Sequence, residues 1–267
     1  MPDSVIDSVV ITRPSAQAGP LAARVAALGF KVTQLPLLEI HALTGAEEKA
    51  QLATTLASLA DYDLVTFVSP NAIDSVFAQL PTWPAGVPIA VVGEGSRLAL
   101  AAHGVTDANA SITSPADTAR SDSEHLLLAL DLASLRGKRV LIVRGDGGRD
   151  FLADGLRAAG AEVAFMTAYR RAVPTLTPAL QATLENLLQH QHDWIITSSE
   201  ALRGLLHLLD LLRQQAGNDG IVVRMQQQHL IVPHARIAQT AAGLGFARVT
   251  LTGSGDAAVL AALQSRP

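Results

Sequence analysis

The sequence predicts an α/β protein with two parallel-sheet lobes, and three observations lead to this prediction. Short apolar runs alternate with segments of helical periodicity along the chain, as in parallel sheets covered by helices on both faces. The stretch from Val140 to Val163 repeats, without a gap, the stretch from Val9 to Val32 that lies 131 residues earlier. The 267 residues suit two domains of roughly 130 residues each.

In the first half, apolar runs bounded by turn residues indicate strands, and recurring leucine and alanine indicate helices. The predicted strands are Val9–Ile11, Lys31–Leu35, Leu64–Val68 and Pro88–Val92. The predicted helices are Pro20–Leu28, Glu47–Leu59, Ala72–Leu80, Arg97–Ala102 and Glu124–Leu132. The segment 107–123 is polar and lacks a period, so it is interpreted as a loop.

The second half continues the same alternation. Its predicted strands are Val140–Val143, Val163–Met166, Trp194–Ile196, Leu230–Val232 and Val249–Leu251. Its predicted helices begin at Phe151 and stop before Gly160, and then follow at Leu180–Leu188, Ala201–Leu212, Ile237–Gly243 and Ala257–Leu263. Two stretches, Leu35–His41 and Ala172–Pro178, are interpreted as extended, and Gln214–Gly220 as a turn region.

Composition excludes several classes of protein. Hydrophobic residues make up 49% of the chain, which favours a globular fold over disorder. No apolar run approaches the ~20 residues of a membrane span, and the polar, acidic segment 1–8 does not resemble a signal peptide. There is no cysteine, so disulfides and thiolate metal sites are excluded and a cytoplasmic location is expected. A net charge of −4 without a basic run argues against nucleic-acid or anionic-membrane binding.

Six predicted strands are followed by small, polar or glycine-bearing loops, each of which leads into a helix. Ligands of open α/β sheets bind outside these carboxyl ends, and helix N-termini bind carboxylate or phosphate without lysine. Such residues also cap helices where no ligand binds, so only the repeated set of six loops points to an anion. The candidates are Thr12, Arg13, Pro14, Ser69, Pro70, Asn71, Gly93, Glu94, Gly95, Ser96, Arg144, Gly145, Gly147, Arg149, Thr197, Ser198, Ser199, Glu200, His234, Ala235 and Arg236.

Motifs for cofactors and metals are absent or incomplete. Neither glycine-rich loop completes the dinucleotide pattern GxGxxG, and there is no P-loop and no GxSxG elbow. His190 with His192, and Arg170 with Arg171, are interpreted as solvated surface pairs. Asp63 and Asp193 precede strands at matching positions and are expected to serve as turn or cap residues.

Several stretches together resemble the uroporphyrinogen-III synthases, over essentially the whole chain. They are 11–14 (ITRP), 67–72 (FVSPNA), 122–124 (DSE), and 144–149 (RGDGGR) followed by 168–171 (AYRR). The resemblance implies two flavodoxin-like lobes joined by a two-stranded hinge, with discontinuous domains. Residues 1–37 and 174–267 would then form lobe 1, residues 40–171 lobe 2, and residues 36–41 and 170–176 the connecting strands.

The resemblance also implies a reaction. The substrate would be hydroxymethylbilane, which is cyclised with loss of water and inversion of its terminal ring, without cofactor or metal. The family's cleft tyrosine corresponds to Tyr169, whose phenol can donate a proton at neutral pH. Substrate contacts in this family come largely from main-chain N–H groups. Where threonine is common in related loops, this chain has Ser96, which could keep a hydroxyl contact, and Arg236, which could not.

Two further expectations concern partners and an alternative function. The chain is expected to be a monomer whose small-molecule substrate could be handed over by the preceding enzyme of the pathway. The alternative is a non-catalytic bilobal binding protein for a small anion, because two repeated α/β lobes suit that function equally well. The span from RGDGGR to AYRR favours the synthase.

Overall fold

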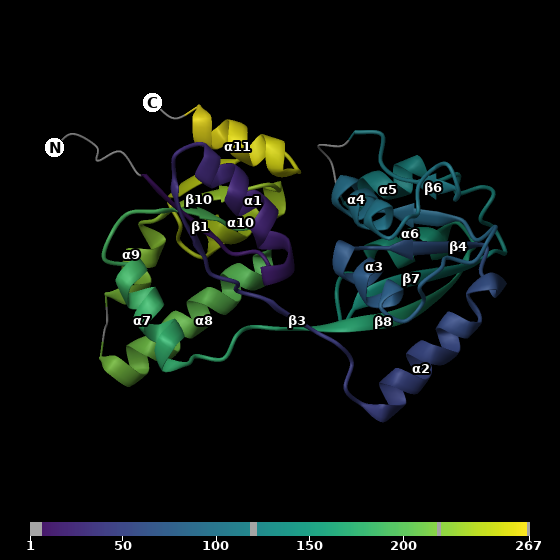
Figure 1. Cartoon of the computed structure of the whole chain (residues 1–267), viewed down its shortest axis with the longest axis horizontal. Coiled ribbons are helices and arrows are strands. Elements are labelled where there is room, and N and C mark those ends of the chain that lie inside the picture. Colours follow the sequence, from purple (N-terminus) through teal and green to yellow (C-terminus); the bar gives the residue numbers. More distant parts are fainter. Residues whose placement is uncertain (1–6, 118–121, 218–219, 266–267) are drawn as a thin grey trace. The chain divides into compact units, whose positions relative to one another are not determined.

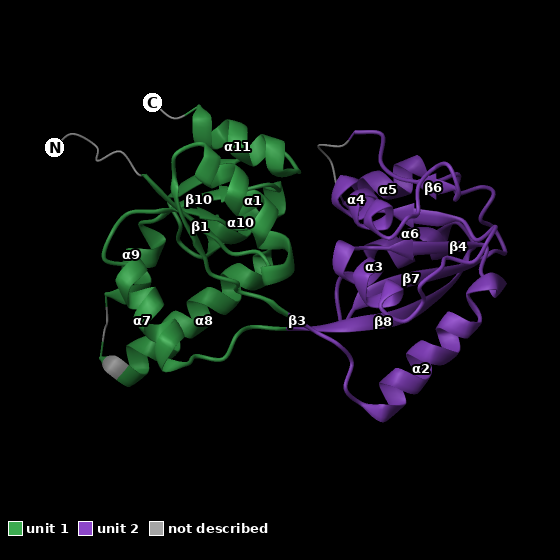
Figure 2. Cartoon of the chain, viewed as in Figure 1, with its two compact units in different colours: residues 1–39, 172–267 green, residues 40–171 purple. Residues whose placement is uncertain are grey.

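The computed structural model describes residues 7–117, 122–217 and 220–265, which form two compact units (Figure 1). Unit 1 comprises Met1–Glu39 and Ala172–Pro267, and unit 2 comprises Ile40–Arg171 (Figure 2). Residues 118–121 of the predicted loop and residues 218–219 of the predicted turn region lie outside the described residues. Parallel sheets in both units confirm the predicted α/β class.

Unit 1 contains a five-stranded parallel sheet with the strand order β11-β10-β9-β1-β2. Its strands are β1 (Ser8–Ile11), β2 (Lys31–Gln34), β9 (Asp193–Ile195), β10 (His229–Val232) and β11 (Arg248–Leu251). Numbered within the sheet, this is the 2-1-3-4-5 order of flavodoxin-like folds. In such a sheet the crevice for a ligand opens where the order reverses, here between β1 and β9.

Successive residues of a strand face opposite sides of the sheet, so the apolar strands of unit 1 present side chains on both faces. Helices cover both of these faces. They are α1 (Ser15–Ala27), α7 (Pro178–Leu187), α8 (Ser199–Ala216), α9 (Ile221–Gln226), α10 (Ala235–Gly243) and α11 (Asp256–Gln264). Val9 and Ile195 pack with α1 and α11, whereas Val10 and Trp194 pack with α7 to α10. Two separate apolar cores therefore hold this sheet.

Unit 2 contains a six-stranded sheet with the order β3-β8-β7-β4-β5-β6. Its strands are β3 (Glu39–His41), β4 (Leu64–Phe67), β5 (Ile89–Val91), β6 (Ile112–Thr113), β7 (Arg139–Gly145) and β8 (Glu162–Ala172). Without β3 the order matches that of unit 1, with β7 and β8 in the places of β1 and β2. The repeat found in the sequence is thus a repeat of structure, and the strand order of this sheet reverses between β7 and β4, the position where ligands of such sheets bind.

The helices of unit 2 also form two layers. They are α2 (Ala46–Ala57), the 3₁₀ turn η1 (Leu59–Asp61), α3 (Pro70–Phe77), α4 (Glu94–Ala102), α5 (Ser123–Ala129) and α6 (Phe151–Ala158). Val65 and Leu141 pack with α2, α3 and α4 on one face, and Leu64 and Val140 pack with α5 and α6 on the other.

Several helices begin earlier than predicted, because the polar residues of their first turns were interpreted as loops. Helix α1 begins at Ser15, five residues before Pro20, and Pro20 lies inside it on the exposed side. Water can reach the carbonyl that this proline leaves without a donor. Helices α4 and α10 begin at Glu94 and Ala235, so residues placed in loops belong to first turns.

Five further differences come from weak local patterns. Strand β6 lies in the segment predicted as a loop, and helix α9 was not predicted because it is short. Helix α8 continues to Ala216, into the predicted turn region. Strand β7 extends to Gly145 and β8 to Ala172, beyond the apolar runs by which the strands were identified.

Candidate functional site

The carboxyl ends of three neighbouring strands in unit 2 bring three predicted residues together. Tyr169 lies on β8, Gly145 ends β7, and Ser69 follows β4, and these strands are adjacent in the order β8-β7-β4. The Tyr169 hydroxyl lies 3.0 Å from the Ser69 hydroxyl. The phenol therefore crosses the end of β7, at the point where the strand order reverses.

Glycine at position 145 makes this crossing possible. A Cβ there would lie 2.9 Å from two ring atoms of Tyr169, closer than real side chains approach. The pairing of β7 with β8 shifts register between Arg144 and Gly145, which places Gly145 opposite Tyr169. Tyr169 is 4% exposed, so its ring belongs to the core, and its hydroxyl meets that of Ser69 just beyond the end of β4.

Asp146, which sequence reasoning did not select, fixes the strand that carries Tyr169. Its amide donates to the Tyr169 carbonyl at 3.0 Å, and its carboxylate accepts from the Arg171 amide at 2.9 Å. The Arg171 guanidinium also donates to the Asp146 carbonyl at 3.2 Å. The prediction of a solvated pair is therefore wrong for Arg171, which is half-buried and binds Asp146, whereas Arg170 is exposed and binds Glu48 at the surface. An aspartate within a glycine-rich loop was the signal for this role.

The two candidate arginines of the glycine-rich loop hold partners within unit 2. Arg144 donates to Asp150 at 2.7 Å and stacks 3.9 Å above the ring of Phe165. Arg149 donates to both carboxylate oxygens of Glu124, at 2.6 and 3.2 Å, which lowers the pKa of that carboxyl group. These side chains are therefore neutralised locally and shape the loop.

A second set of unit 2 candidates forms the first turns of α3 and α4. Ser69 caps α3 and Pro70 is its first residue, followed by Asn71. Gly93 caps α4, and Glu94 and Gly95 are exposed in its first turn. Ser96 is 2% exposed and its amide donates to the Gly93 carbonyl. Ser96 is therefore packed inside unit 2, and its hydroxyl contact with a ligand stays a prediction.

The corresponding edge of unit 1 is built differently. Thr12 is 2% exposed, and its hydroxyl donates to the Ile195 carbonyl at 2.8 Å, so it closes the gap between β1 and β9. Arg13 donates to Asp256 at 2.6 Å, at the start of α11, and Pro14 caps α1. Thr12 and Arg13 thus have roles inside unit 1, and Asp256 was missed because its partner lies at the other end of the sequence.

The first turns of α8 and α10 complete the unit 1 edge, after half-buried Thr197. The Ser198 hydroxyl accepts the amides of Glu200 and Ala201, at 3.2 and 3.3 Å. The Ser199 hydroxyl accepts from Thr240 of α10 at 3.0 Å, which joins the two helices. On α10, His234 is the cap, and Ala235 and Arg236 are exposed in the first turn. Ser69 in unit 2 and Ser198 in unit 1 thus cap the helices that follow the corresponding strands β4 and β9.

The amino ends of the strands carry a second polar cluster in unit 1. Asp193 is fully buried and lies 2.6 Å from His229, whose other ring nitrogen lies 2.8 Å from the Thr250 hydroxyl. Burial lowers the pKa of His229, and Arg248 lowers it further. His192 lies 2.5 Å from the Ser8 hydroxyl and is half-buried, so the prediction of a solvated histidine is wrong for His192, whereas His190 is exposed as predicted.

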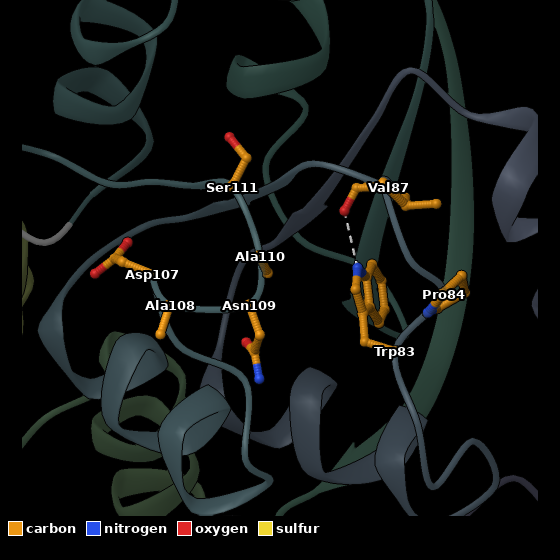
Figure 3. A pocket seen from close by; sticks show the side chains of 9 residues that line it. Trp83, Pro84, Val87, Asp107, Ala108, Asn109, Ala110 and Ser111 are labelled. Atoms are coloured by element: carbon orange, nitrogen blue, oxygen red, sulfur yellow. Dashed lines mark hydrogen bonds between the residues drawn. The ribbon is translucent and has the colours of Figure 1, made fainter.

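A cavity of about 430 Å³ opens in unit 2, at the amino ends of β5 and β6 (Figure 3). The indole of Trp83 stands at one side, and its N–H donates to the Val87 carbonyl at 2.9 Å. Asp107 pairs with Arg97, and Asn109 donates to Gly104 at 2.8 Å. Because its polar side chains bind within the unit, the cavity indicates no ligand class.

Neither a metal-binding cluster nor a membrane-spanning helix occurs among the described residues. No cluster of three or more histidine, aspartate or glutamate side chains among residues 7–117, 122–217 and 220–265 could hold a metal ion. Within the same residues, no helix combines the length and the apolar character needed to cross a membrane.

Comparison with known proteins gives a consistent result over nearly the whole chain. A family model described as "Uroporphyrinogen-III synthase HemD" matches residues 19–251. The uroporphyrinogen-III synthase of Salmonella typhimurium is 34% identical over 262 residues, covering 96% of this chain and all of the relative. That of Escherichia coli K12 is 31% identical with the same coverage.

Solved structures share the fold at low sequence identity. The uroporphyrinogen-III synthetase of Helicobacter pylori aligns with a TM-score of 0.61 at 17% identity, covering 98% of this chain and all of that one. A mutant synthase from Thermus thermophilus aligns with a TM-score of 0.56 at 15% identity, covering 97% and 99%. At these identities the structures support the fold alone.

Proposed function

The chain belongs to the uroporphyrinogen-III synthase family, and we propose that the phenol of Tyr169 donates the proton needed for its reaction. The chain is a lyase of tetrapyrrole biosynthesis that cyclises hydroxymethylbilane, with loss of water and inversion of the terminal ring. The observation that carries this function is the likeness to curated synthases along nearly the entire length. That likeness favours catalysis over the alternative of a binding protein.

For this reaction the protein must mainly position the substrate and donate one proton to its hydroxyl group. The substrate hydroxyl leaves as water once protonated, which generates an electrophilic azafulvenium. The terminal pyrrole then attacks through its substituted carbon, and the spiro intermediate fragments and recloses with that ring inverted. Holding the linear substrate in a bent conformation supplies most of the rate enhancement. An acid at the substrate hydroxyl raises the rate by a further factor of roughly 10².

Tyr169 suits the role of acid for two reasons. Its hydroxyl lies at the carboxyl edge of the unit 2 sheet, where the strand order reverses and ligands of such sheets bind. Its ring is held by Gly145, so the direction of the hydroxyl is fixed. A phenol can therefore be presented to the substrate without reorganisation.

We further propose that main-chain N–H groups bind the substrate's acetate and propionate groups. The exposed first turns of α4 in unit 2 and of α10 in unit 1, and the half-buried first turn of α8, present such donors together with the positive end of the helix dipole. The side chains of Arg13, Arg144 and Arg149 hold internal partners. Carboxylate binding would then depend on backbone geometry, which divergent sequences can preserve.

Four finer points remain proposals. We propose that the chain acts as a monomer, that it receives hydroxymethylbilane from the preceding enzyme of the pathway, and that it is cytoplasmic. We also propose that residues 36–41 and 170–176 serve as the connecting strands of lobes spanning 1–37 with 174–267, and 40–171.

Isomer analysis tests the function and the acid together. Hydroxymethylbilane is supplied continuously, and the oxidised products are separated by chromatography, with a protein-free control for spontaneous closure to the type I isomer. We expect the type III isomer from the wild type without added metal or nucleotide. Tyr169→Phe should lower kcat by roughly 10²-fold, whereas Tyr62→Phe, at the only other tyrosine of the chain, should not.

Each outcome bears on a different claim. If the wild type yields type I alone, the synthase function is wrong and the binding-protein alternative gains. Should Tyr169→Phe form type III at the wild-type rate, the function stands and the acid is another group or water. Circular dichroism must show that both variants keep the wild-type fold.

A further inference from the structure

The hydroxyl of Ser69 meets two groups at once. It accepts the Ala72 amide at 3.2 Å, as the cap of α3, and it lies 3.0 Å from the Tyr169 hydroxyl. A serine hydroxyl has one hydrogen and two acceptor lone pairs. The Ala72 amide takes one lone pair, so either Tyr169 donates to the other or Ser69 donates its own hydrogen to Tyr169.

Only one of these two arrangements permits Tyr169 to act as an acid. If the phenol donated to Ser69, its hydrogen would be engaged within the protein. If Ser69 donates, the phenol hydrogen points away from Ser69, and the phenolate that remains after proton transfer receives a hydrogen bond. The positive end of α3 stabilises the same negative charge, because Ser69 is the capping residue of that helix.

We propose that Ser69 is the positioning residue of Tyr169, donating to the phenol oxygen so that the phenol proton faces the substrate. This proposal rests on the proposed acid role of Tyr169. It also reassigns Ser69, which the sequence had indicated as a direct substrate contact. Proton transfer breaks the Tyr169 O–H bond and forms a bond to the substrate hydroxyl. The C–O bond then breaks with its electron pair leaving on water, and phenolate and azafulvenium remain.

The residue that follows Ser69 offers no competing main-chain donor to the phenol oxygen. Pro70, the first residue of α3, has no N–H, so the amide nearest the cap cannot replace the Ser69 hydroxyl. Gly145 lies against the ring, which prevents the phenol from turning toward another partner. In unit 1 the capping Ser198 accepts two amides instead. The use of a cap hydroxyl to hold a phenol is therefore specific to unit 2.

Two substitutions at Ser69 test the proposal. Ser69→Ala should lower kcat by roughly tenfold and leave KM within about twofold, because the substrate does not contact this hydroxyl. Ser69→Thr, which keeps both the cap and the donor, should restore most of the rate. The matched control is Thr177→Ala in α7, which removes a cap hydroxyl that accepts an amide at the same 3.2 Å but lies outside the proposed site. It should leave kcat unchanged.

Two further measurements separate a positioning role from a structural one. With a bilane whose hydroxyl is replaced by a group that departs without a proton, the Ser69→Ala and Tyr169→Phe defects should both shrink to about twofold. The double variant Ser69→Ala/Tyr169→Phe should be no slower than Tyr169→Phe alone, because Ser69 acts through the phenol. Additive losses, or a rise in KM that persists with the activated substrate, would overturn the proposal and indicate direct substrate binding.

The outcomes distinguish this proposal from the ones on which it depends. A wild type that forms only the type I isomer contradicts the function. A fast Tyr169→Phe contradicts the acid role, and the role of Ser69 with it. A slow Tyr169→Phe together with a fast Ser69→Ala contradicts the Ser69 proposal alone.

Discussion

The two units share one strand order but use its reversal point in different ways. In unit 2, Gly145 leaves room at the end of β7, and the phenol of Tyr169 crosses it to reach Ser69. In unit 1 the repeat aligns Pro14 with Gly145, and Thr12, which directly follows β1, donates to the Ile195 carbonyl and joins β1 to β9. The two units therefore share the strand order of the sheet, but only unit 2 places a phenol hydroxyl at the point where this order reverses.

The capping serines extend the same contrast. Ser69 is followed by Pro70, so the first residue of α3 has no main-chain donor and the serine hydroxyl is the polar group at that position. Ser198 is followed by Ser199, which has a main-chain N–H. The Ser198 hydroxyl accepts the amides of the next two residues, Glu200 and Ala201, and not that of Ser199. Unit 2 therefore offers side-chain chemistry at this turn, and unit 1 offers a main-chain donor for an anion.

The amino edges differ in burial. Asp193 is fully buried beside His229 in unit 1, whereas its counterpart Asp63 in unit 2 is exposed and binds the Arg139 amide and Lys138. The Arg139 amide and then Lys138 lower the pKa of Asp63. One sheet is thus joined by an internal polar network and the other by surface contacts, which predicts different responses to mutation and to acid.

The largest expected effect comes from removing the buried carboxylate. Asp193→Ala leaves His229 without its partner inside unit 1, so the free energy of unfolding should fall by about 3 kcal/mol. The matched variant Asp63→Ala should change it far less, since water replaces the lost contacts. Urea unfolding followed by circular dichroism measures both. Hydrogen exchange should place the Asp193→Ala loss in β9 and β10, and similar losses in both variants would contradict the contrast.

Acid should act on unit 1 before unit 2. Burial lowers the pKa of His229 and of His192, so the folded state holds their neutral forms while the unfolded chain takes up protons near the ordinary value of 6.5. The stability that these residues contribute is present above pH 6.5 and is lost as the pH falls toward their folded-state pKa values. The slope is at most about 1.4 kcal/mol per pH unit for each histidine.

Hydrogen exchange at several pH values measures this difference directly. Between pH 7 and 5, protection of β9 and β10 should fall more than protection of β4 and β7. His229→Gln, which can still reach a neighbouring strand but does not titrate, should flatten the response of unit 1. Equal losses in the two sheets would show that the buried histidines do not govern acid stability.

The sequence predicted the fold class well because buried parallel strands are continuous apolar runs, as in Val140–Val143 and Leu64–Val68. The prediction failed where polar residues form regular structure. Glu94 and Ala235 begin helices inside predicted loops, and Ser15 begins a helix ahead of its predicted start at Pro20, because capping and first-turn residues share the composition of loops. Strand β8 continues past its apolar run through alternating polar residues, which a search for continuous hydrophobicity does not detect.

The sequence indicated which residues lie at the ends of the strands, but not which of them contact one another. Tyr169, Gly145 and Ser69 were all candidates, but their meeting depends on three strands that are separated in the chain. Thr12 and Ser96 were candidates as polar residues after strands, and their burial could not be predicted from residue type. Asp146 and Asp256 were missed because their partners, Arg171 and Arg13, are set by tertiary structure.

The smallest expected effect tests the main-chain donor of unit 1. Ser199→Pro removes the first amide of α8, and proline is well tolerated there because Ser198 before it is extended, with φ −144° and ψ 131°. If that amide binds a substrate carboxylate, KM should rise about fivefold with little change in kcat, as expected for one lost hydrogen bond of about 1 kcal/mol. Ser199→Ala keeps the amide and loses only the contact with Thr240, so its KM should stay within about twofold of wild type. Circular dichroism checks that α8 is intact in both variants. Equal KM values for Ser199→Pro and Ser199→Ala would mean that unit 1 does not bind the substrate through this turn. The difference between Ser198–Ser199 in unit 1 and Ser69–Pro70 in unit 2 would then matter for folding alone.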